Sequence, residues 1–265
     1  MEFEINIIDA FTDDVFGGNQ AAVIVTESWL PEGLMQSIAS ENNLSETAFL
    51  VKEELNTYGI RWFSPISEIA FCGHATLASA FVLFNKYPDI GSFNFKAEAV
   101  GVLPVTKNND LTLNMNFPNT VPTEVTEVPL EIQEGLSIQP HELYANQQAY
   151  FVIYKSEKDV LSVERKNEIL KRLKPLDVVV TCKSQSPEYD FMSRYFWPAN
   201  GGDEDPVTGS IHTGLAPFWA SRLGKNELTA FQASKRGGIL NCRVDGDRVY
   251  ISGNAVQYLK GTIIV

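Results

Sequence analysis

The sequence is poor in cysteine and histidine and has no long apolar run. Three cysteines and three histidines occur among its 265 residues. Because Cys72, Cys182 and Cys242 are widely spaced, they match neither a disulfide framework nor a zinc-ligand pattern, and a reducing cytoplasm fits best. No run of about 18 apolar residues is present, so we expect no transmembrane helix. The start of the chain, with Glu2 and Glu4, does not resemble a signal peptide.

Positive charge is also scarce. The formal net charge of −12 argues against nucleic acid and anionic membranes as partners. A small anionic substrate remains compatible with this charge, because such a molecule responds to local charge. No phosphate loop, dinucleotide fingerprint, metal-ligand spacing or Ser-His-Asp arrangement is recognisable, so we expect neither a cofactor nor a metal.

The most informative stretch that is present leads through Cys72-Gly73-His74 into the apolar segment Ala75–Phe84. A helix that is apolar on every side is either a membrane span or the buried centre of a domain, and this one is too short to span a bilayer. We therefore predict a buried central helix over about residues 74–85. Since the first N–H groups of a helix lack internal partners and carry partial positive charge, its start is a candidate anion site.

A second stretch, Asn200–Trp219, has the same design: a Gly-rich loop followed by a largely apolar segment. Asp205 is a good N-cap, Pro206 is a good first helical residue and Gly224 is a good stop. These signals predict a second central helix over about residues 206–223. Two such units, roughly 130 residues apart, indicate an internally duplicated chain with a site between its halves.

The rest of the chain divides into two similar halves. With 44% apolar residues, the chain can bury a large core as one or two domains. Pro118–Pro129 is the best linker candidate because it is rich in proline and lacks apolar periodicity. We therefore predict halves over residues 1–118 and 119–265. Each should contain a few strands, a side helix, a central helix and a closing meander, and Gly261–Val265 could pair back onto the first half.

Local sequence leaves two interpretations open for several polar residues. Glu46 could be an exposed residue at a strand end or a carboxylate among apolar neighbours. His74 could be a structural histidine, and Asp205 could be an N-cap only. The Ser210 hydroxyl could bond back along its own helix. Asn19 could belong to a hairpin turn or line a site.

Six short motifs are spread over most of the chain. They are Asp9-Ala10-Phe11-Thr12, Phe16-Gly17-Gly18-Asn19, Asn43-Leu44-Ser45-Glu46-Thr47, Arg61-Trp62-Phe63-Ser64-Pro65, Cys72-Gly73-His74-Ala75-Thr76 and Glu204-Asp205-Pro206-Val207-Thr208-Gly209-Ser210. With these motifs the chain resembles the PhzF-like family, named for an enzyme of phenazine biosynthesis. The resemblance implies the α+β, diaminopimelate-epimerase-like fold. In that fold two pseudo-symmetric domains each wrap a curved, mostly antiparallel sheet around a central helix, and the active site lies where both helices begin. It also implies a homodimer.

The resemblance assigns roles to individual residues. Glu46 matches the family's proton-transfer glutamate, and His74 and Asp205 match residues that hold polar groups of the substrate during catalysis. Ser210 matches a further site residue of the family, and Gly73 and Gly209 match positions that offer backbone N–H groups to the substrate. We add Asn19 to this substrate-binding set because its Gly-rich turn could line the site.

Cys72 matters because epimerases and racemases of this fold use two facing cysteines. Cys72 stands at or next to the first of those positions, but the segment Asp205–Thr208, where the second falls, contains no cysteine. A two-thiol epimerase is therefore disfavoured, and Cys72 is interpreted as a small apolar residue.

The resemblance favours a cofactor-independent isomerase that moves a proton between carbons of a small, cyclic substrate bearing a carboxylate. The founding member of the family isomerises a dihydro-hydroxyanthranilate. The alternative is a binding protein of the same fold that does not turn over a substrate.

Overall fold

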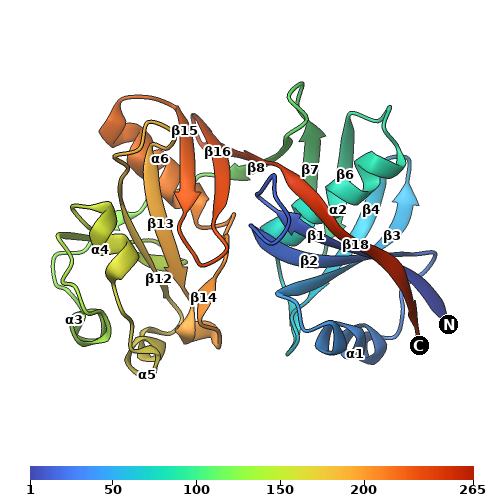
Figure 1. The fold of residues 1–265 in the computed structure, drawn as a ribbon, viewed down its shortest axis with the longest axis horizontal. Coiled ribbons are helices and arrows are strands. Elements are labelled where there is room, and N and C mark those ends of the chain that lie inside the picture. The colour runs from blue at the N-terminus through green and yellow to red at the C-terminus, as the bar shows by residue number, and fades with distance from the viewer. The chain divides into compact units, whose positions relative to one another are not determined.

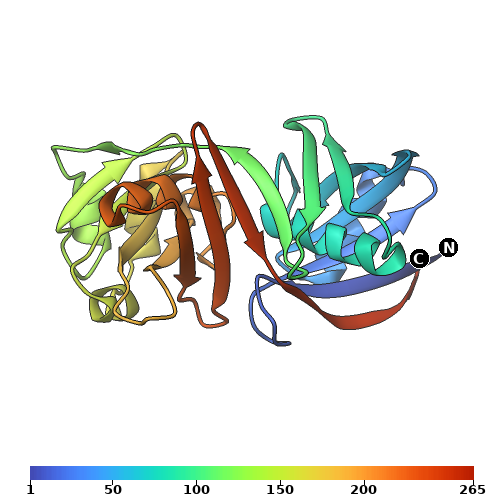
Figure 2. The same cartoon turned by 90° about the horizontal axis from the view of Figure 1, so that it is seen from above.

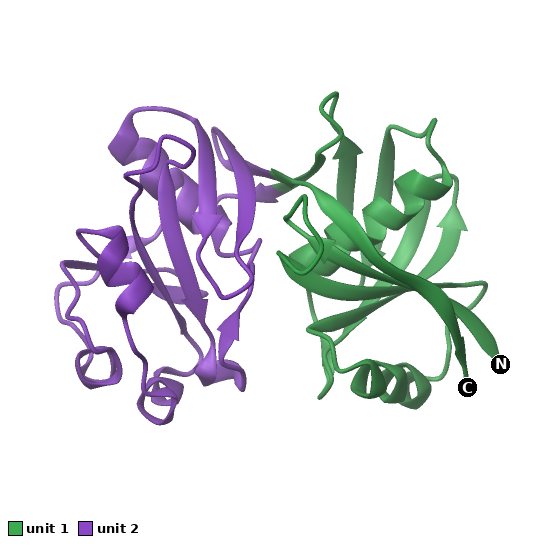
Figure 3. Cartoon of the chain, viewed as in Figure 1, with its two compact units in different colours: residues 1–116, 252–265 green, residues 117–251 purple.

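The structure is a computed structural model that describes residues 1–265. The chain forms two compact units (Figure 3). Unit 1 comprises residues 1–116 and 252–265, and unit 2 comprises residues 117–251. None of the helices has the length and apolar character that a membrane crossing requires.

Unit 1 is a curved sheet with two helices. Its helices are α1 (Glu32–Asn42) and α2 (Gly73–Lys86). Its strands are β1 (Glu2–Ala10), β2 (Asn19–Thr26), β3 (Glu46–Glu54), β4 (Thr57–Phe63), β5 (Glu68–Ile69), β6 (Ser92–Ala97), β7 (Gly101–Lys107) and β18 (Ala255–Ile264). Strand β8 (Leu113–Pro118) pairs with β7 and leads into unit 2. At the opposite edge, β18 pairs with β1 from Glu2↔Ile264 to Ala10↔Ala255.

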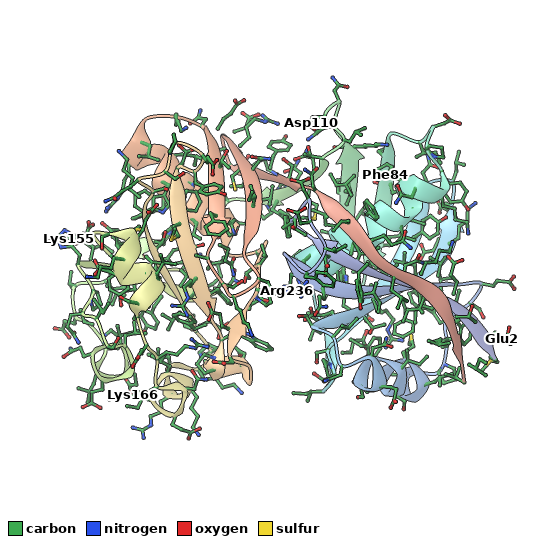
Figure 4. All side chains as sticks on the ribbon, in the orientation of Figure 1. Glu2, Phe84, Asp110, Lys155, Lys166 and Arg236 are labelled. Atoms are coloured by element: carbon green, nitrogen blue, oxygen red, sulfur yellow. The ribbon has the colours of Figure 1, made fainter.

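Helix α2 is the centre of unit 1, as the sequence predicts. Ten of its residues are buried, and the sheet curves around it (Figures 1 and 2). It contacts β1, β2, β3, β6, β7 and β18, so its first two turns are enclosed and only its C-terminal end reaches solvent. Helix α1 lies outside the sheet and packs Met35 and Ile38 against Phe49 of β3. Figure 4 shows Phe84 on α2, whereas charged side chains such as Glu2 and Asp110 project from the periphery of the unit.

Unit 2 contains four α-helices and two short 3-10 helices. The helices are α3 (Leu130–Gly135), α4 (Glu157–Ser162), α5 (Asn167–Leu170), η1 (Lys171–Leu173), η2 (Pro198–Asn200) and α6 (His212–Leu223). The strands are β9 (Thr123–Glu124), β10 (Glu142–Ala145), β11 (Ala149–Ile153), β12 (Asp177–Lys183), β13 (Phe191–Phe196), β14 (Glu204–Asp205), β15 (Glu227–Gln232) and β16 (Gly238–Asp245). Strand β17 (Arg248–Gly253) leads back to unit 1.

The strand pairings repeat between the units. In unit 1, β2 pairs in parallel with β3, β3 pairs antiparallel with β4, and β4 pairs in parallel with β6. In unit 2, β11, β12, β13 and β15 pair in the same sequence of directions. A two-residue strand, β5 or β14, adds to the third strand of each series before the central helix begins. This repetition matches the predicted duplication and the predicted α+β class with mostly antiparallel sheets.

The second central helix starts later than predicted. The N-cap signal at Asp205 predicted a helix over about 206–223, but α6 begins at His212 with Ile211 as its N-cap. Asp205 lies in β14, where it pairs with Tyr195 of β13. Its carboxylate accepts a hydrogen bond from the Thr208 hydroxyl at 2.5 Å. The N-cap assignment was therefore wrong, because the Asp205 side chain stabilises the preceding loop.

A proline inside α6 is accommodated by a residue of the loop between β8 and β9. Pro217 has no N–H to donate to the carbonyl of Thr213, four residues earlier. The backbone N–H of Thr120 donates to that carbonyl instead, at 3.0 Å. The hydroxyl groups of Thr120 and Thr213 are also 2.7 Å apart. The incoming chain of unit 2 therefore supplies the partner that the helix itself lacks.

Candidate active site

Unit 1 brings a carboxylate and an imidazole into contact. Glu46 is the first residue of β3 and His74 is the second residue of α2, so two element starts place them together. The Nε2 atom of His74 lies 2.7 Å from Oε2 of Glu46, with 6% and 13% of the two side chains exposed. Apart from this contact, the buried Oε2 atom has no hydrogen-bond partner. The exposed strand-end interpretation of Glu46 does not describe this residue.

Asn19 orients the imidazole from its other side. The side-chain Nδ2 of Asn19 is 3.1 Å from Nδ1 of His74. The Ser45 hydroxyl donates to Oδ1 of Asn19 at 2.9 Å, which directs the amide nitrogen toward the ring. In this arrangement Nδ1 accepts a hydrogen bond, and the proton of a neutral ring resides on Nε2, facing Glu46. Asn19, the first residue of β2, is thus placed in the same cluster.

The surroundings favour the charged form of His74. Burial by itself lowers the pKa of His74, but the contact with the Glu46 carboxylate opposes burial, and the pKa lies well above its ordinary value. A protonated ring needs an acceptor at Nδ1, which the Asn19 amide provides on rotation by half a turn. The Ser45 hydroxyl can accept from the rotated amide, since a hydroxyl both donates and accepts. The cluster can therefore bind the ring in either protonation state.

Cys72 is closer to the chemistry than its interpretation as a small apolar residue implies. Its Sγ lies 3.4 Å from Nδ1 of His74. Burial and the nearby Glu46 carboxylate raise the pKa of the Cys72 thiol to about 11, so the thiol is protonated at neutral pH. Cys182, by contrast, packs in the hydrophobic core of unit 2. A protonated thiol is a poor base and a poor nucleophile.

The same cluster could also hold a metal ion. One donor atom each from Glu46, Cys72 and His74 lies within 4.8 Å of the others. Linear spacing did not indicate this set, because Glu46 comes from a different element. Its donor types, one carboxylate, one thiol and one imidazole, are compatible with a divalent transition metal.

Unit 2 holds the other residues predicted for the site. The buried Gln232 side chain accepts from the N–H of Thr208 at 2.9 Å and donates to the carbonyl of Asp205 at 2.9 Å. Gln232 also donates to the Thr208 hydroxyl, which therefore donates its own proton to the Asp205 carboxylate. Gln232 thus locks the loop that carries Asp205, although no sequence motif marked it.

Ser210 lies in the turn that precedes α6. Its hydroxyl oxygen accepts a hydrogen bond from Nε2 of Gln148 at 2.9 Å, so it does not bond back along the helix. The carbonyl groups of Gly209 and Ser210 accept from the N–H groups of His212 and Thr213. The N–H groups of Gly209 and Ser210, like those of Gly73 and His74 at the start of α2, come before the first intrahelical hydrogen bond and have no partner within their helix. Each unit thus presents amide donors at the start of its central helix.

His212 is a structural histidine. Its Nδ1 lies 2.8 Å from the carbonyl of Thr208, and burial lowers its pKa to about 4. The ring is neutral at physiological pH and packs near Phe191. It therefore contributes packing and one hydrogen bond to the loop that leads into α6.

Comparison with known proteins identifies the family. The model of the phenazine biosynthesis-like protein family PhzC-PhzF matches residues 8–261. Two uncharacterized isomerases of Pseudomonas aeruginosa are 43% and 44% identical to the chain, over 99% of each chain. A crystal structure of a PhzF family protein from Enterococcus faecalis, 42% identical, superposes with a TM-score of 0.93 over 100% of both chains. A predicted epimerase from Pseudomonas aeruginosa, 17% identical with a TM-score of 0.78, shares the fold. The chain therefore belongs to the phenazine biosynthesis-like, or PhzF, family and has its diaminopimelate-epimerase-like fold.

Proposed function

We propose that this protein is a cofactor-independent isomerase that moves a proton between two carbons of a small, cyclic carboxylate. The isomerase names of its relatives support the reaction class. The main support for the proposal is the environment of the Oε2 atom of Glu46. This buried carboxylate oxygen touches one imidazole nitrogen, at 2.7 Å, and has no other partner. A positioned carboxylate of this kind has a lone pair available for a substrate proton.

In the proposed reaction Glu46 removes a proton from a carbon made acidic by a neighbouring unsaturated or carboxylate group. It then returns a proton to a different carbon. His74, whose two ring nitrogens contact Glu46 and Asn19, steadies the charge on Glu46. The carboxylate of the substrate is assigned to Ser210 and to the amide N–H groups at Gly73 and Gly209, because amide groups at a helix start attract anions.

Two further site residues complete the proposal. Asp205, fixed by Thr208 and Gln232, accepts a hydrogen bond from a hydroxyl or amino group of the substrate. Asn19 holds the His74 ring in place. A two-thiol epimerase is disfavoured, since the Cys72 thiol has a pKa of about 11 and no cysteine lies in Asp205–Thr208.

Proton exchange in deuterated water tests the proposal. A panel of cyclic amino and hydroxy acids is incubated with the protein, and NMR follows both deuterium incorporation and product formation. Glu46→Gln preserves the shape of the side chain and one acceptor oxygen but cannot accept a proton. The exchange rate should therefore fall by about 10²–10⁴-fold or more. The dissociation constant of the acid should change far less, because Glu46 is not assigned to the carboxylate.

The matched control is Glu54→Gln, which removes an exposed carboxylate at the other end of the same strand. It should leave exchange unchanged. An acid that binds tightly to wild type without exchange or conversion would support a binding protein instead. An unchanged rate in Glu46→Gln would remove Glu46 from the mechanism.

A further inference from the structure

Ser210 is the end of a hydrogen-bond chain in unit 2 that is buried at Tyr195 and Asp177. Nε2 of Gln148 lies 2.9 Å from the Ser210 hydroxyl oxygen and 3.2 Å from the Tyr195 phenol oxygen. The Tyr195 hydroxyl donates to Oδ2 of Asp177 at 2.7 Å. The other carboxylate oxygen, Oδ1, accepts from the side chain of Asn200 at 2.9 Å. Asp177 and Tyr195 are only 7% and 5% exposed.

The direction of every hydrogen bond in this chain follows from Asp177. An ionised carboxylate only accepts, so Tyr195 must donate its single proton to Asp177. The Tyr195 oxygen can then only accept, which requires Gln148 to present its amide nitrogen and not its carbonyl oxygen. That nitrogen also donates to Ser210. The Ser210 oxygen is thereby used as an acceptor, and its own proton remains to be donated elsewhere.

The backbone holds the chain in register. The N–H of Asp177 donates to the carbonyl of Gln148 at 3.0 Å, next to the parallel pairing of β11 with β12. The N–H of Gln148 donates to the side chain of Asn146 at 2.8 Å. Burial raises the pKa of Tyr195 above its ordinary value, so its hydroxyl stays protonated. Hydrogen bonds therefore hold both the backbone of Gln148 and the amide nitrogen of its side chain.

We propose that Asp177, Tyr195 and Gln148 are positioning residues that hold the Ser210 hydroxyl as a hydrogen-bond donor for a carboxylate ligand. The inference rests on the proposed function, which assigns the substrate carboxylate to Ser210. It goes further in specifying how that hydroxyl is oriented before the ligand arrives. Pre-orientation of a donor lowers the entropic cost of binding and favours an acceptor over a donor group on the ligand.

Tyr195→Phe tests the relay, with cyclohex-1-ene-1-carboxylate as the probe and its neutral carboxamide as the comparison ligand. The substitution removes the acceptor that fixes the Gln148 amide, so Gln148 can turn its carbonyl oxygen to Ser210 and capture the hydroxyl proton. A hydrogen bond to a charged group is typically worth a factor of about ten or more. We expect Ser210→Ala and Tyr195→Phe each to weaken carboxylate binding about tenfold, measured by NMR titration.

The double variant separates positioning from general damage. If Tyr195 acts through Ser210, Tyr195→Phe should weaken binding no further once Ser210 is alanine. The matched control is Tyr154→Phe, which removes another buried tyrosine hydroxyl of unit 2, bonded to the carbonyl of Ile138 at 2.7 Å. It should leave carboxylate binding unchanged.

Three results would each overturn either the relay or the carboxylate assignment. Wild-type affinity in Tyr195→Phe, together with weakened binding in Ser210→Ala, would overturn the relay and leave the proposed function intact. Wild-type affinity in Ser210→Ala would overturn the assignment of the carboxylate to Ser210 itself. Full additivity in the double variant would also overturn the relay.

A ligand-free measurement keeps the inference testable without a probe. In wild type both protons of the Gln148 amide have acceptors, so their exchange with solvent should be slow by NMR. Tyr195→Phe should accelerate exchange of these protons and shift their resonances, whereas Tyr154→Phe should not. Unchanged Gln148 resonances in Tyr195→Phe would contradict the relay.

Discussion

Asp177 should make the protein less stable as the pH rises from about 4 to 6. Burial raises the pKa of this carboxyl from its ordinary 3.8 to about 6, against the opposing effect of hydrogen bonds from Tyr195 and Asn200. In this pH window the unfolded carboxyl has lost its proton while the folded one keeps it. The folded state then binds more protons, so stability falls as the pH rises and stays lower above pH 6.

The magnitude follows from the two pKa values. At 1.36 kcal/mol for each pH unit between 3.8 and about 6, the ionised carboxylate costs about 3 kcal/mol above pH 6. Asp177→Asn removes the ionisation and keeps one acceptor for the Tyr195 hydroxyl. The free energy of unfolding of the variant, relative to wild type, should therefore rise by up to about 3 kcal/mol between pH 4 and pH 7.

Urea unfolding at pH 4, 5, 6 and 7, followed by fluorescence and circular dichroism, measures this difference. Any constant cost of rearranging the Asn200 hydrogen bond cancels, because only the change with pH is compared. Glu134→Gln, which removes an exposed carboxylate of α3 in the same unit, is the control and should track wild type. Parallel stability profiles for wild type and Asp177→Asn would refute the reasoning.

Three further predictions concern other parts of the molecule. Cys72→Ala should keep most of the proton-exchange activity, because a thiol with a pKa of about 11 is not a base at neutral pH; a loss of 10²-fold or more would restore a thiol mechanism. Gly18→Ala should destabilise the protein by more than about 1 kcal/mol in urea unfolding, since Gly18 has φ +58 and a Cβ there would lie 2.0 Å from the carbonyl oxygen of Ala10. Gly91→Ala meets open space and should be nearly neutral, so equal effects would contradict the steric argument. The resemblance to the family predicts a homodimer, which light scattering at micromolar concentration checks; a monomeric mass would exclude it.

The central helix of unit 1 is predictable because its sequence is compatible with only one environment, the buried interior of its own domain. A short segment that is apolar on every side must be enclosed by its own domain, and α2 spans Gly73–Lys86, against a prediction of about 74–85. The strand pairings around it do not follow from local pattern. They depend on contacts between distant segments, such as the parallel pairing of β4 with β6.

The start of α6 shows where local signals fail. Asp205 followed by Pro206 has the composition of a helix start, but the buried Gln232 amide, 27 residues away in sequence, holds the Asp205 carbonyl. That tertiary hydrogen bond keeps Asp205 in β14 and delays the helix to His212. The intrinsic preference of a residue is a weak constraint compared with a buried polar network.

The residues of the cluster around Glu46 could be predicted from sequence motifs, whereas the hydrogen-bond chain that leads from Ser210 to Asp177 could not. Glu46, His74 and Asn19 each occur within a motif that resembles the family. Gln148 is separated from Ser210 by 62 positions and from Tyr195 by 47, and neither Gln148 nor Tyr195 lies in a recognisable pattern. Only the fold reveals that they touch.

The return of β18 to unit 1 has a consequence for biosynthesis. Unit 2 is one continuous segment, whereas unit 1 needs both ends of the chain, so β1 lacks its partner strand until β18 has been synthesised. At synthesis rates of about 5–20 residues per second, the interval between β1 and β18 lasts roughly 10–50 s. Throughout that time β1 carries an unpaired edge, which is a template for association with other chains. The nascent protein is thus most vulnerable in its first strand, and loss of the last ten residues would make that exposure permanent.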